Sequence, residues 1–367
     1  MTRHTDRGST WRNAVRMVTM AVGMSLTLGL AAIIPAGAAE ETGPLDLEAE
    51  LSDLIGLQYG GGVALSVHDG QTTSAAVGFA DAAGDPMTLD SGFRIGWFGM
   101  QFVAAVVLQL VDEGRVDLDA PLTTYLPDVP LGGDATIREL LMQQTRLSND
   151  LPELISRYVQ DPDHLWTIDE IIEVAAEVAR SEGTRVEQLG PTEYHLLIKL
   201  VEVLDGPFGE VFDRRIAEPL GLQGTSYPGS RLPDGLAAGW YPDLGVQGQP
   251  DIGGLDRISA FRTTGPDLVR FIQGLLGGEI VSSDLVAEVF SDQAGPITLG
   301  AFFLPDMMDY PGKRFFGTVG GDFTGYSFEI VVDPESGDIA IVLTNDGYID
   351  PHPVAVSIVD SWEAASG

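Results

Sequence analysis

The sequence of 367 residues contains no cysteine, which excludes disulfides, thiolate metal sites and a cysteine nucleophile. Lysine is nearly absent as well: only Lys199 and Lys313 occur, and the formal net charge is −34 at pH 7. A surface this acidic repels phosphate backbones and anionic lipids. We therefore exclude nucleic acid as a partner. No Gly-x-Ser-x-Gly elbow, Walker motif or dinucleotide-binding motif is present either.

The first 38 residues have the features of an export signal. Four arginines precede an uncharged, mostly apolar stretch over residues 17–34, and Ala36 and Ala38 form a small-x-small cleavage site. The apolar stretch is also long enough to remain as an N-terminal anchor. The sequence therefore predicts a secreted or cell-envelope protein, attached to a membrane only if this segment stays uncleaved.

Strand patterns occur near both ends of the chain, and helical patterns lie between them. "GGVALSVHDG" and "QTTSAAVGFAD" alternate as a hairpin, and "ITLGAFFL", "RFFGTV", "YSFEIVVDP" and "DIAIVLTND" follow much later. The expected helices are Phe98–Glu113, Ile137–Gln143, Thr167–Arg180, Thr192–Leu204, Phe208–Ile216, Pro266–Leu276 and Val354–Ala364, preceded by one within "PLDLEAELSDLIG".

This order predicts an α/β fold of the α+β type, in which both chain ends build one antiparallel sheet flanked by helices. A helical lobe is inserted between the two groups of strands. We expect one domain over residues 39–367 after the signal at 1–38, with a sheet lobe at about 45–97 and 278–367 and a helical lobe at about 98–277.

Four separated segments carry a resemblance to a known family. They are "FRIG" with the helix ending "LQLVDEGRVDLDAPLTTYLPD", then "ATIRELLMQQTRL", "RIAEPLGLQGTSYP" and "GTVGGDFTGYSFEIVVDPESGDIAIVLTND". In this order they resemble the serine beta-lactamase-like and penicillin-binding protein family, in the branch of class C beta-lactamases, DD-peptidases and esterases. The resemblance implies a beta-lactamase/transpeptidase-like fold with the active site between the two lobes.

The resemblance also implies three catalytic motifs, and this sequence lacks all of them. The serine and lysine of Ser-x-x-Lys fall on Trp97 and Met100. Tyr-x-Asn falls on Leu189, Gly190 and Pro191, or one residue earlier, and the lysine or histidine of Lys/His-x-Gly falls on Thr318. The usual His-Thr-Ser-Gly segment is replaced by residues 143–146, "QQTR".

The triple loss predicts a catalytically inactive protein with a binding or scaffolding role. Neither an indole nor a thioether acts as a nucleophile or base near neutral pH, and losing the nucleophile of a coupled site costs on the order of 10⁶-fold in rate. The alternative is an esterase or peptidase of the serine hydrolase family that acts through non-standard residues. We expect neither a cofactor nor a resident metal.

The candidate pocket is apolar around the lost motifs. Its expected lining consists of Trp97, Phe98, Met100, Gln143, Tyr194, Thr318, Gly320 and Asp322. Such a lining favours a peptide, a cell-wall fragment, an apolar small molecule or a protein partner. Asp322 would repel the carboxylate of the family's usual substrates.

The histidines offer only weak alternatives. His164 in "DPDHLW" lies among acids but has no second histidine at ligand spacing, and His195 follows Tyr194 on an expected helix. His68 and His352 fall next to a turn and in an expected loop.

Overall fold

The computed structural model describes residues 45–56, 60–145, 147, 150–161, 164, 166–182, 190–227, 237–241, 246–247, 257–291, 297–303, 310, 315–321 and 325–366. The export signal expected over residues 1–38 lies outside these ranges. Among the helices within them, none combines the length and apolar character that crossing a membrane requires.

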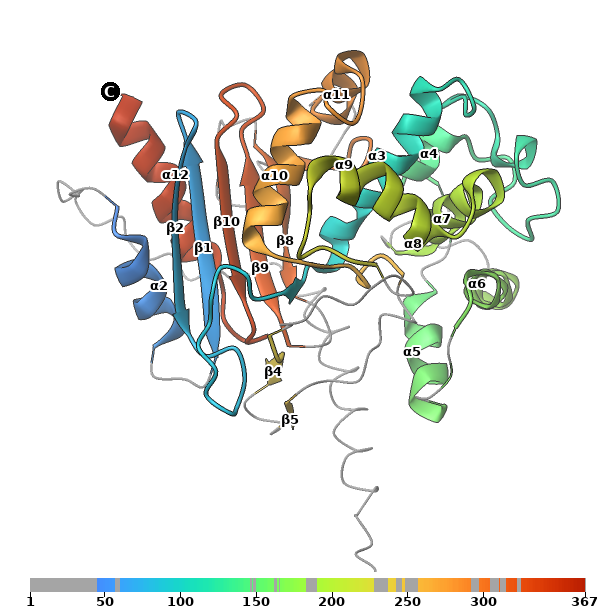
Figure 1. Ribbon diagram of the computed structural model, residues 1–367. Coiled ribbons are helices and arrows are strands. Elements are labelled where there is room, and N and C mark those ends of the chain that lie inside the picture. The colour runs from blue at the N-terminus through green and yellow to red at the C-terminus, as the bar shows by residue number, and fades with distance from the viewer. Residues whose placement is uncertain are drawn as a thin grey trace, which may run out of the picture.

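A six-stranded antiparallel sheet forms the centre of the fold, in the order β2-β1-β10-β9-β8-β7 (Figure 1). Its strands are β1 (Gly61–His68), β2 (Gln71–Gly78), β7 (Phe302–Phe303), β8 (Phe316–Gly321), β9 (Ser327–Val332) and β10 (Ile339–Thr344). Val63 in β1 lies opposite Leu343 in β10, so strands from the two chain ends meet inside the sheet. The predicted fold class is confirmed.

The hairpin of β1 and β2 turns at the predicted Asp-Gly pair. Asp69 and Gly70 have φ angles of 49° and 71°. Two positive φ angles are typical of the type I′ turn, whose twist matches that of the strands it joins. The turn therefore sets the register in which His68 faces Gln71.

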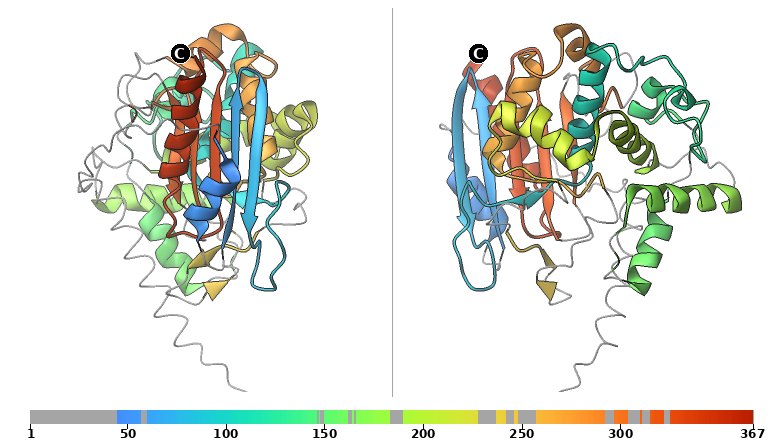
Figure 2. Two further views of the ribbon diagram at one scale, coloured as in Figure 1. Left: turned by 90° about the vertical axis from the view of Figure 1, so that its left-hand side faces the viewer. Right: turned by 45° about the vertical axis from the view of Figure 1, so that its right-hand side comes forward.

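The two faces of the sheet bury different residues of each strand, as the period of two requires. In β1, Val63, Leu65 and Val67 belong to the large core, whereas Ala64 lies in a second core on the opposite face. That second core is covered by α2 (Leu47–Ile55) and α12 (His352–Ser366), which lie side by side across the sheet (Figure 2).

On the other face, α10 (Gly265–Leu276) packs against β1 and β10, with α11 (Ser283–Val289) beside it. A Cβ atom at Gly265 would come within 2.4 Å of Leu65, so α10 begins directly on the sheet. This helix packs on the sheet although its residues fall within the range expected for the helical lobe.

The remaining helices gather beside the sheet (Figure 2). They are α3 (Gly99–Asp112), α4 (Ile137–Leu141), α5 (Leu151–Gln160), α6 (Ile168–Glu182), α7 (Thr192–Asp205), α8 (Phe208–Phe212) and α9 (Glu218–Leu220), with the short segments η1 (Gly96–Phe98), η2 (Leu122–Thr124) and η3 (Asp213–Ala217). α3 lies deepest, because eleven of its fourteen residues are buried. It stops near Gly114, whose φ of 68° is the left-handed conformation that commonly ends a helix.

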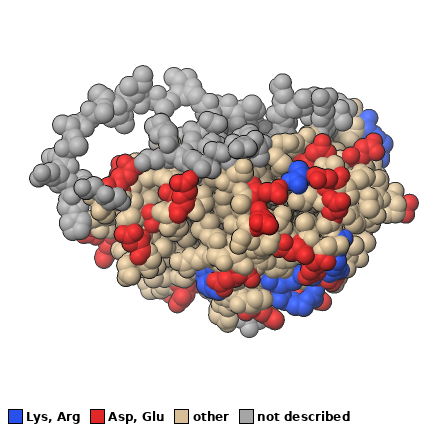
Figure 3. Space-filling view, turned by 90° about the horizontal axis from the view of Figure 1, so that it is seen from above, with Lys and Arg blue, Asp and Glu red and all other residues tan. Residues whose placement is uncertain are grey.

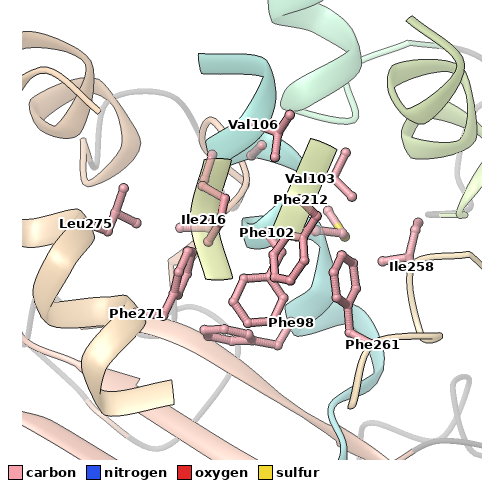
Figure 4. Close-up of a cluster of buried hydrophobic side chains, with 14 of the residues drawn as sticks. Phe98, Phe102, Val103, Val106, Phe212, Ile216, Ile258, Phe261, Phe271 and Leu275 are labelled. Carbon is pink, nitrogen blue, oxygen red and sulfur yellow. The ribbon is translucent and has the colours of Figure 1, made fainter. Parts of the chain in front are cut away.

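An aromatic cluster fastens α3 to its neighbours (Figure 4). The ring centroid of Phe102 lies 5.2 Å from that of Phe212, 4.9 Å from that of Phe261 and 4.5 Å from that of Phe271. These rings come from four separate segments, so the large core depends on the tertiary fold rather than on any one helix.

The sequence missed several short elements. They are the helices α5 and α11 and two small ladders, β3 (Phe93–Arg94) with β6 (Arg262–Thr263) and β4 (Trp240–Tyr241) with β5 (Val246–Gln247). The seven residues of α11 and the two-residue strands are too short to carry a clear periodic signal. The pattern of α5 is amphipathic and was missed nonetheless. His352, expected in a loop, is the first residue of α12, and proline at the second position is compatible with a helix start.

On the face seen in Figure 3, acidic side chains are widely spread and the few basic ones stand beside them. Ion pairs join the ends of α3 and α7 to η3. Arg215 contacts Asp205 at 2.6 Å and Glu113 at 2.6 Å, and Arg115 contacts Asp205 at 3.0 Å. Burial alone would raise the pKa of Asp205, but the hydrogen bonds from Arg215 and Arg115 outweigh it and lower that pKa to about 2.

Candidate functional site

The first turn of α3 is shaped by two glycines. Gly96 has a φ of 45°, and a Cβ atom there would lie 3.1 Å from the Phe328 ring. At Gly99 a Cβ atom would lie 2.1 Å from the backbone oxygen of Ile258. The segment containing Ile258 thus presses directly on the start of α3, and only glycine fits between them.

This turn directs the three bulky side chains differently. Phe98 is fully buried, and its ring meets Phe102 at 5.8 Å and Phe271 at 6.2 Å between centroids. It therefore packs into the core (Figure 4). Met100 is also fully buried, whereas Trp97 is only partly buried and packs against the edge of the large core.

Gln143 links the segments that carry two of the lost motifs. Its Nε2 atom donates a hydrogen bond of 2.9 Å to the backbone oxygen of Gly190 and lies 3.8 Å from the Met100 sulfur. Met100 stands where the resemblance places a lysine, and Gly190 lies within the segment where it places Tyr-x-Asn. The two positions are thus brought together by one carboxamide.

The third lost motif lies on β8, next to the same turn, because η1 packs against this strand. Thr318 faces Ile330 of β9 and is 4% exposed, and Gly320 faces Phe328. The Phe328 ring contacts the position of Gly96, so it joins β9 to η1. We refer to Trp97, Met100, Gln143, Gly190 and Thr318 together as the candidate site.

Other predicted residues have different surroundings. Tyr194 is fully buried, and its hydroxyl donates a 2.7 Å hydrogen bond to the backbone oxygen of Leu141. Burial, followed by the charge of Glu193, raises the pKa of Tyr194. Pro191 is the buried residue that precedes the first turn of α7. Leu189 and Asp322 lie outside the described residues.

A group of buried ionisable side chains beside the candidate site was not found from the sequence. Glu193 is 5% exposed and accepts a hydrogen bond from the Thr145 hydroxyl. Asp150 is fully buried, with one carboxylate oxygen 3.5 Å from Nδ1 of the buried His195. Glu193 and His195 occupy the start of α7, Asp150 precedes α5, and Thr145 follows α4.

Burial raises the pKa of Glu193 to about 7, and the nearby negative charge of Asp150 adds to this, whereas Thr145 and His195 oppose it. The pKa of this carboxyl group therefore lies well above its ordinary range. The sequence offered one signal for it, a glutamate two residues after a proline at an expected helix start, but such acids are ordinary at exposed helix starts.

The other histidines that the structure describes are paired with acids. His164 contacts Glu170 at 3.2 Å, His68 contacts Asp338 at 3.0 Å, and His352 contacts the buried Glu329 at 3.1 Å. Within the described part of the chain, no three histidine, aspartate or glutamate side chains are grouped so as to hold a metal ion.

The chemistry of the candidate site is that of an apolar, neutral surface. Its described side chains are an indole, a thioether, a carboxamide and a hydroxyl, none of which is a base near neutral pH. Nearby, burial raises the pKa of the Glu193 carboxyl group to about 7.

Comparisons with family models and with known proteins both point to the same family. The family model described as "Beta-lactamase" matches residues 46–357. "Penicillin-binding protein 4" from Amycolatopsis lactamdurans is 27% identical over 321 residues, which cover 78% of this chain and 81% of that protein.

Solved structures agree on the fold. A D-amino acid amidase from Ochrobactrum anthropi SV3, complexed with D-phenylalanine, matches with a TM-score of 0.74 and 22% identity over 87% of this chain and 98% of that chain. The octameric penicillin-binding protein homologue from Pyrococcus abyssi matches with a TM-score of 0.73 and 20% identity over 87% and 77%.

Proposed function

The chain belongs to the beta-lactamase family, and on this premise we propose that it is a secreted, catalytically inactive member that uses the fold for binding. The observation that carries the proposal is the first turn of α3. Trp97 and Met100 stand where the family resemblance places the nucleophile and its base, and Met100 is fully buried. Neither side chain can attack a carbonyl group or remove a proton near neutral pH.

The surroundings of the turn support the same conclusion. Thr318 on β8 and Gly190 before α7 carry no group that could replace the missing lysine, tyrosine or histidine. The aromatic core behind the turn is buried and its rings are in contact, so the scaffold is kept without these catalytic groups. A protein that keeps a scaffold without its chemistry is suited to binding.

The ligand classes follow from the chemistry of the site and from the relatives. One relative is named as a penicillin-binding protein, and one solved neighbour is an amidase complexed with D-phenylalanine. The indole of Trp97 and the neutral groups around it favour an apolar small molecule, a peptide or a cell-wall fragment. A protein partner that uses an apolar anchor would fit the same surface.

Active-site labelling tests the proposal. The purified protein is incubated with a fluorescent penicillin and, separately, a fluorophosphonate, with an active serine beta-lactamase as the positive control. We expect no covalent adduct by mass spectrometry. Stoichiometric acylation would sink the proposal.

A double variant tests how many groups are missing. Trp97→Ser combined with Met100→Lys restores a serine and a lysine one helical turn apart, yet we expect no acylation because the second and third motifs remain absent. Rapid labelling of this folded variant would show that those two motifs are replaced elsewhere in the chain.

One contact favours a second candidate function, hydrolysis of an ester or amide through non-standard residues. The Thr145 hydroxyl donates to Glu193, a carboxyl group whose pKa is raised to about 7 by burial. A hydroxyl paired with such a base is the arrangement that activates a nucleophile. Fluorophosphonate labelling that appears in the wild type and disappears in Thr145→Val would establish this activity in place of the first.

A further inference from the structure

Gln143 has a left-handed backbone conformation, which residues other than glycine rarely adopt. Among the described non-glycine residues only Asp69 and Gln143 have a positive φ, and both are at 49°. Asp69 belongs to the Asp-Gly hairpin turn, where aspartate is ordinary. Gln143 instead follows the C-cap of α4, at the position where most helices that end in this way carry glycine.

The hydrogen bonds around α4 show why the conformation is required. The N–H of Gln143 donates to the oxygen of Leu140, and the N–H of Gln144 donates to the oxygen of Glu139. This pair of bonds is the Schellman motif, which requires a left-handed residue at position 143. Glycine would satisfy the motif without strain, so the side chain of Gln143 needs a separate explanation.

That explanation lies in the two contacts of the carboxamide. Nε2 must face the Gly190 oxygen, because the amide oxygen would be repelled there, and it also lies beside the Met100 sulfur. The remaining oxygen, Oε1, is buried and accepts no hydrogen bond from any residue that the structure describes. The closed arrangement of Gln143 therefore gains one hydrogen bond, but it leaves Oε1 unsatisfied and the backbone of Gln143 strained. Its net stabilisation is small.

We propose that Gln143 is a latch that holds the candidate site closed by tying Met100 on α3 to Gly190 before α7. Opening frees Oε1 to accept a hydrogen bond from water or from a ligand, and uncovers Met100. This rests on the proposed binding function of the site and describes how access to it is controlled.

Peroxide oxidation of methionine measures the latch directly. Met100 is fully buried and Met87 is 5% exposed in the same core, so Met87 reports on opening of the whole domain. Samples are treated with hydrogen peroxide for increasing times, and sulfoxide at each methionine is measured by peptide mass spectrometry. In the wild type we expect slow oxidation of both.

Gln143→Gly is the decisive variant, because it removes both the backbone strain at position 143 and the side-chain contacts with Met100 and Gly190. We expect oxidation of Met100 to rise about fivefold or more, oxidation of Met87 to stay at the wild-type rate, and the urea midpoint to stay equal or rise. Gln143→Asn tolerates the same backbone but is shorter, and should uncover Met100 in the same way.

Asp69→Gly is the matched control, since it makes the same backbone change at the other left-handed residue, in the turn between β1 and β2. It should leave Met100 protected. Met100 that stays protected in folded Gln143→Gly would overturn the latch, and so would a joint rise at Met100 and Met87, which indicates global opening. Acylation of the wild type would refute the proposed function while leaving the oxidation result unchanged.

Discussion

Replacing Glu193 by glutamine should raise the free energy of unfolding above that of the wild type at pH 8. At pH 5 the same replacement should have a much smaller stabilising effect. The carboxyl is buried beside Asp150, and burial raises its pKa to about 7 from 4.5. Glutamine has the same shape and can still accept the hydrogen bond from Thr145, but it carries no charge.

The magnitude follows from the two pKa values. Between pH 4.5 and 7 the unfolded chain loses the proton while the folded protein keeps it, so the wild type loses stability as the pH rises. Each unit of the pKa difference corresponds to about 1.4 kcal/mol, which gives a full penalty of about 3 kcal/mol above pH 7. From pH 5 to pH 8 the change for this one carboxyl is about 2–3 kcal/mol.

Urea unfolding at pH 5 and pH 8, followed by circular dichroism, measures the effect. The difference in unfolding free energy between Glu193→Gln and the wild type is measured at each pH. The value at pH 5 is then subtracted from the value at pH 8, so that any cost of the new amide group, which is the same at both pH values, cancels. Glu48→Gln on the exposed start of α2 is the matched control and should give no difference. An equal effect of Glu193→Gln at both pH values would refute the reasoning, since the folded protein would then ionise this carboxyl like the unfolded chain.

Three further predictions concern the scaffold. Gly99→Ala should destabilise the protein by about 1–3 kcal/mol in urea unfolding, because the new Cβ atom would lie 2.1 Å from the Ile258 oxygen; wild-type stability would show that this segment yields freely. Phe102→Ala should cost about 3–5 kcal/mol by the same measurement, since it empties the centre of the aromatic cluster; a loss below ~1 kcal/mol would contradict the packing described here. Arg215→Ala should move acid unfolding to higher pH. In the wild type, ionised Asp205 stabilises the fold fully above its ordinary pKa of 3.8, and this contribution is lost only as the pH falls through about 2; without Arg215 it should be lost at a higher pH. An unchanged acid midpoint would show that Asp205 does not depend on Arg215.

The family and the fold were readable from the sequence because their signals are local. A run such as Ile339–Thr344 is recognised by its apolar, largely β-branched composition and by the Asp and Asn residues that bound it. The helix at Gly99–Asp112 has apolar residues on almost every face because it is buried. The positions Trp97 and Met100 were identified through the family resemblance, which places the serine and lysine of Ser-x-x-Lys directly after "FRIG". Short elements such as Ser283–Val289 were missed because seven residues carry too little periodicity.

The contacts of the candidate site depend on segments that are distant in the sequence. Nothing in the neighbours of Gln143 indicates that its amide reaches Gly190, 47 residues later, or that its backbone is left-handed. The same holds for Glu193, whose pKa depends on burial and on Asp150, 43 residues earlier in the chain.

The sequence by itself determined which side chains stand at the start of α3 and that Trp97 and Met100 supply neither a nucleophile nor a base, because residue identity and helical spacing are local properties. Only the tertiary structure decided that Phe98 faces the core, that Gln143 contacts both Met100 and Gly190, and that burial raises the pKa of Glu193. Burial and hydrogen bonding arise from the packing of separate segments, and no local pattern specifies them.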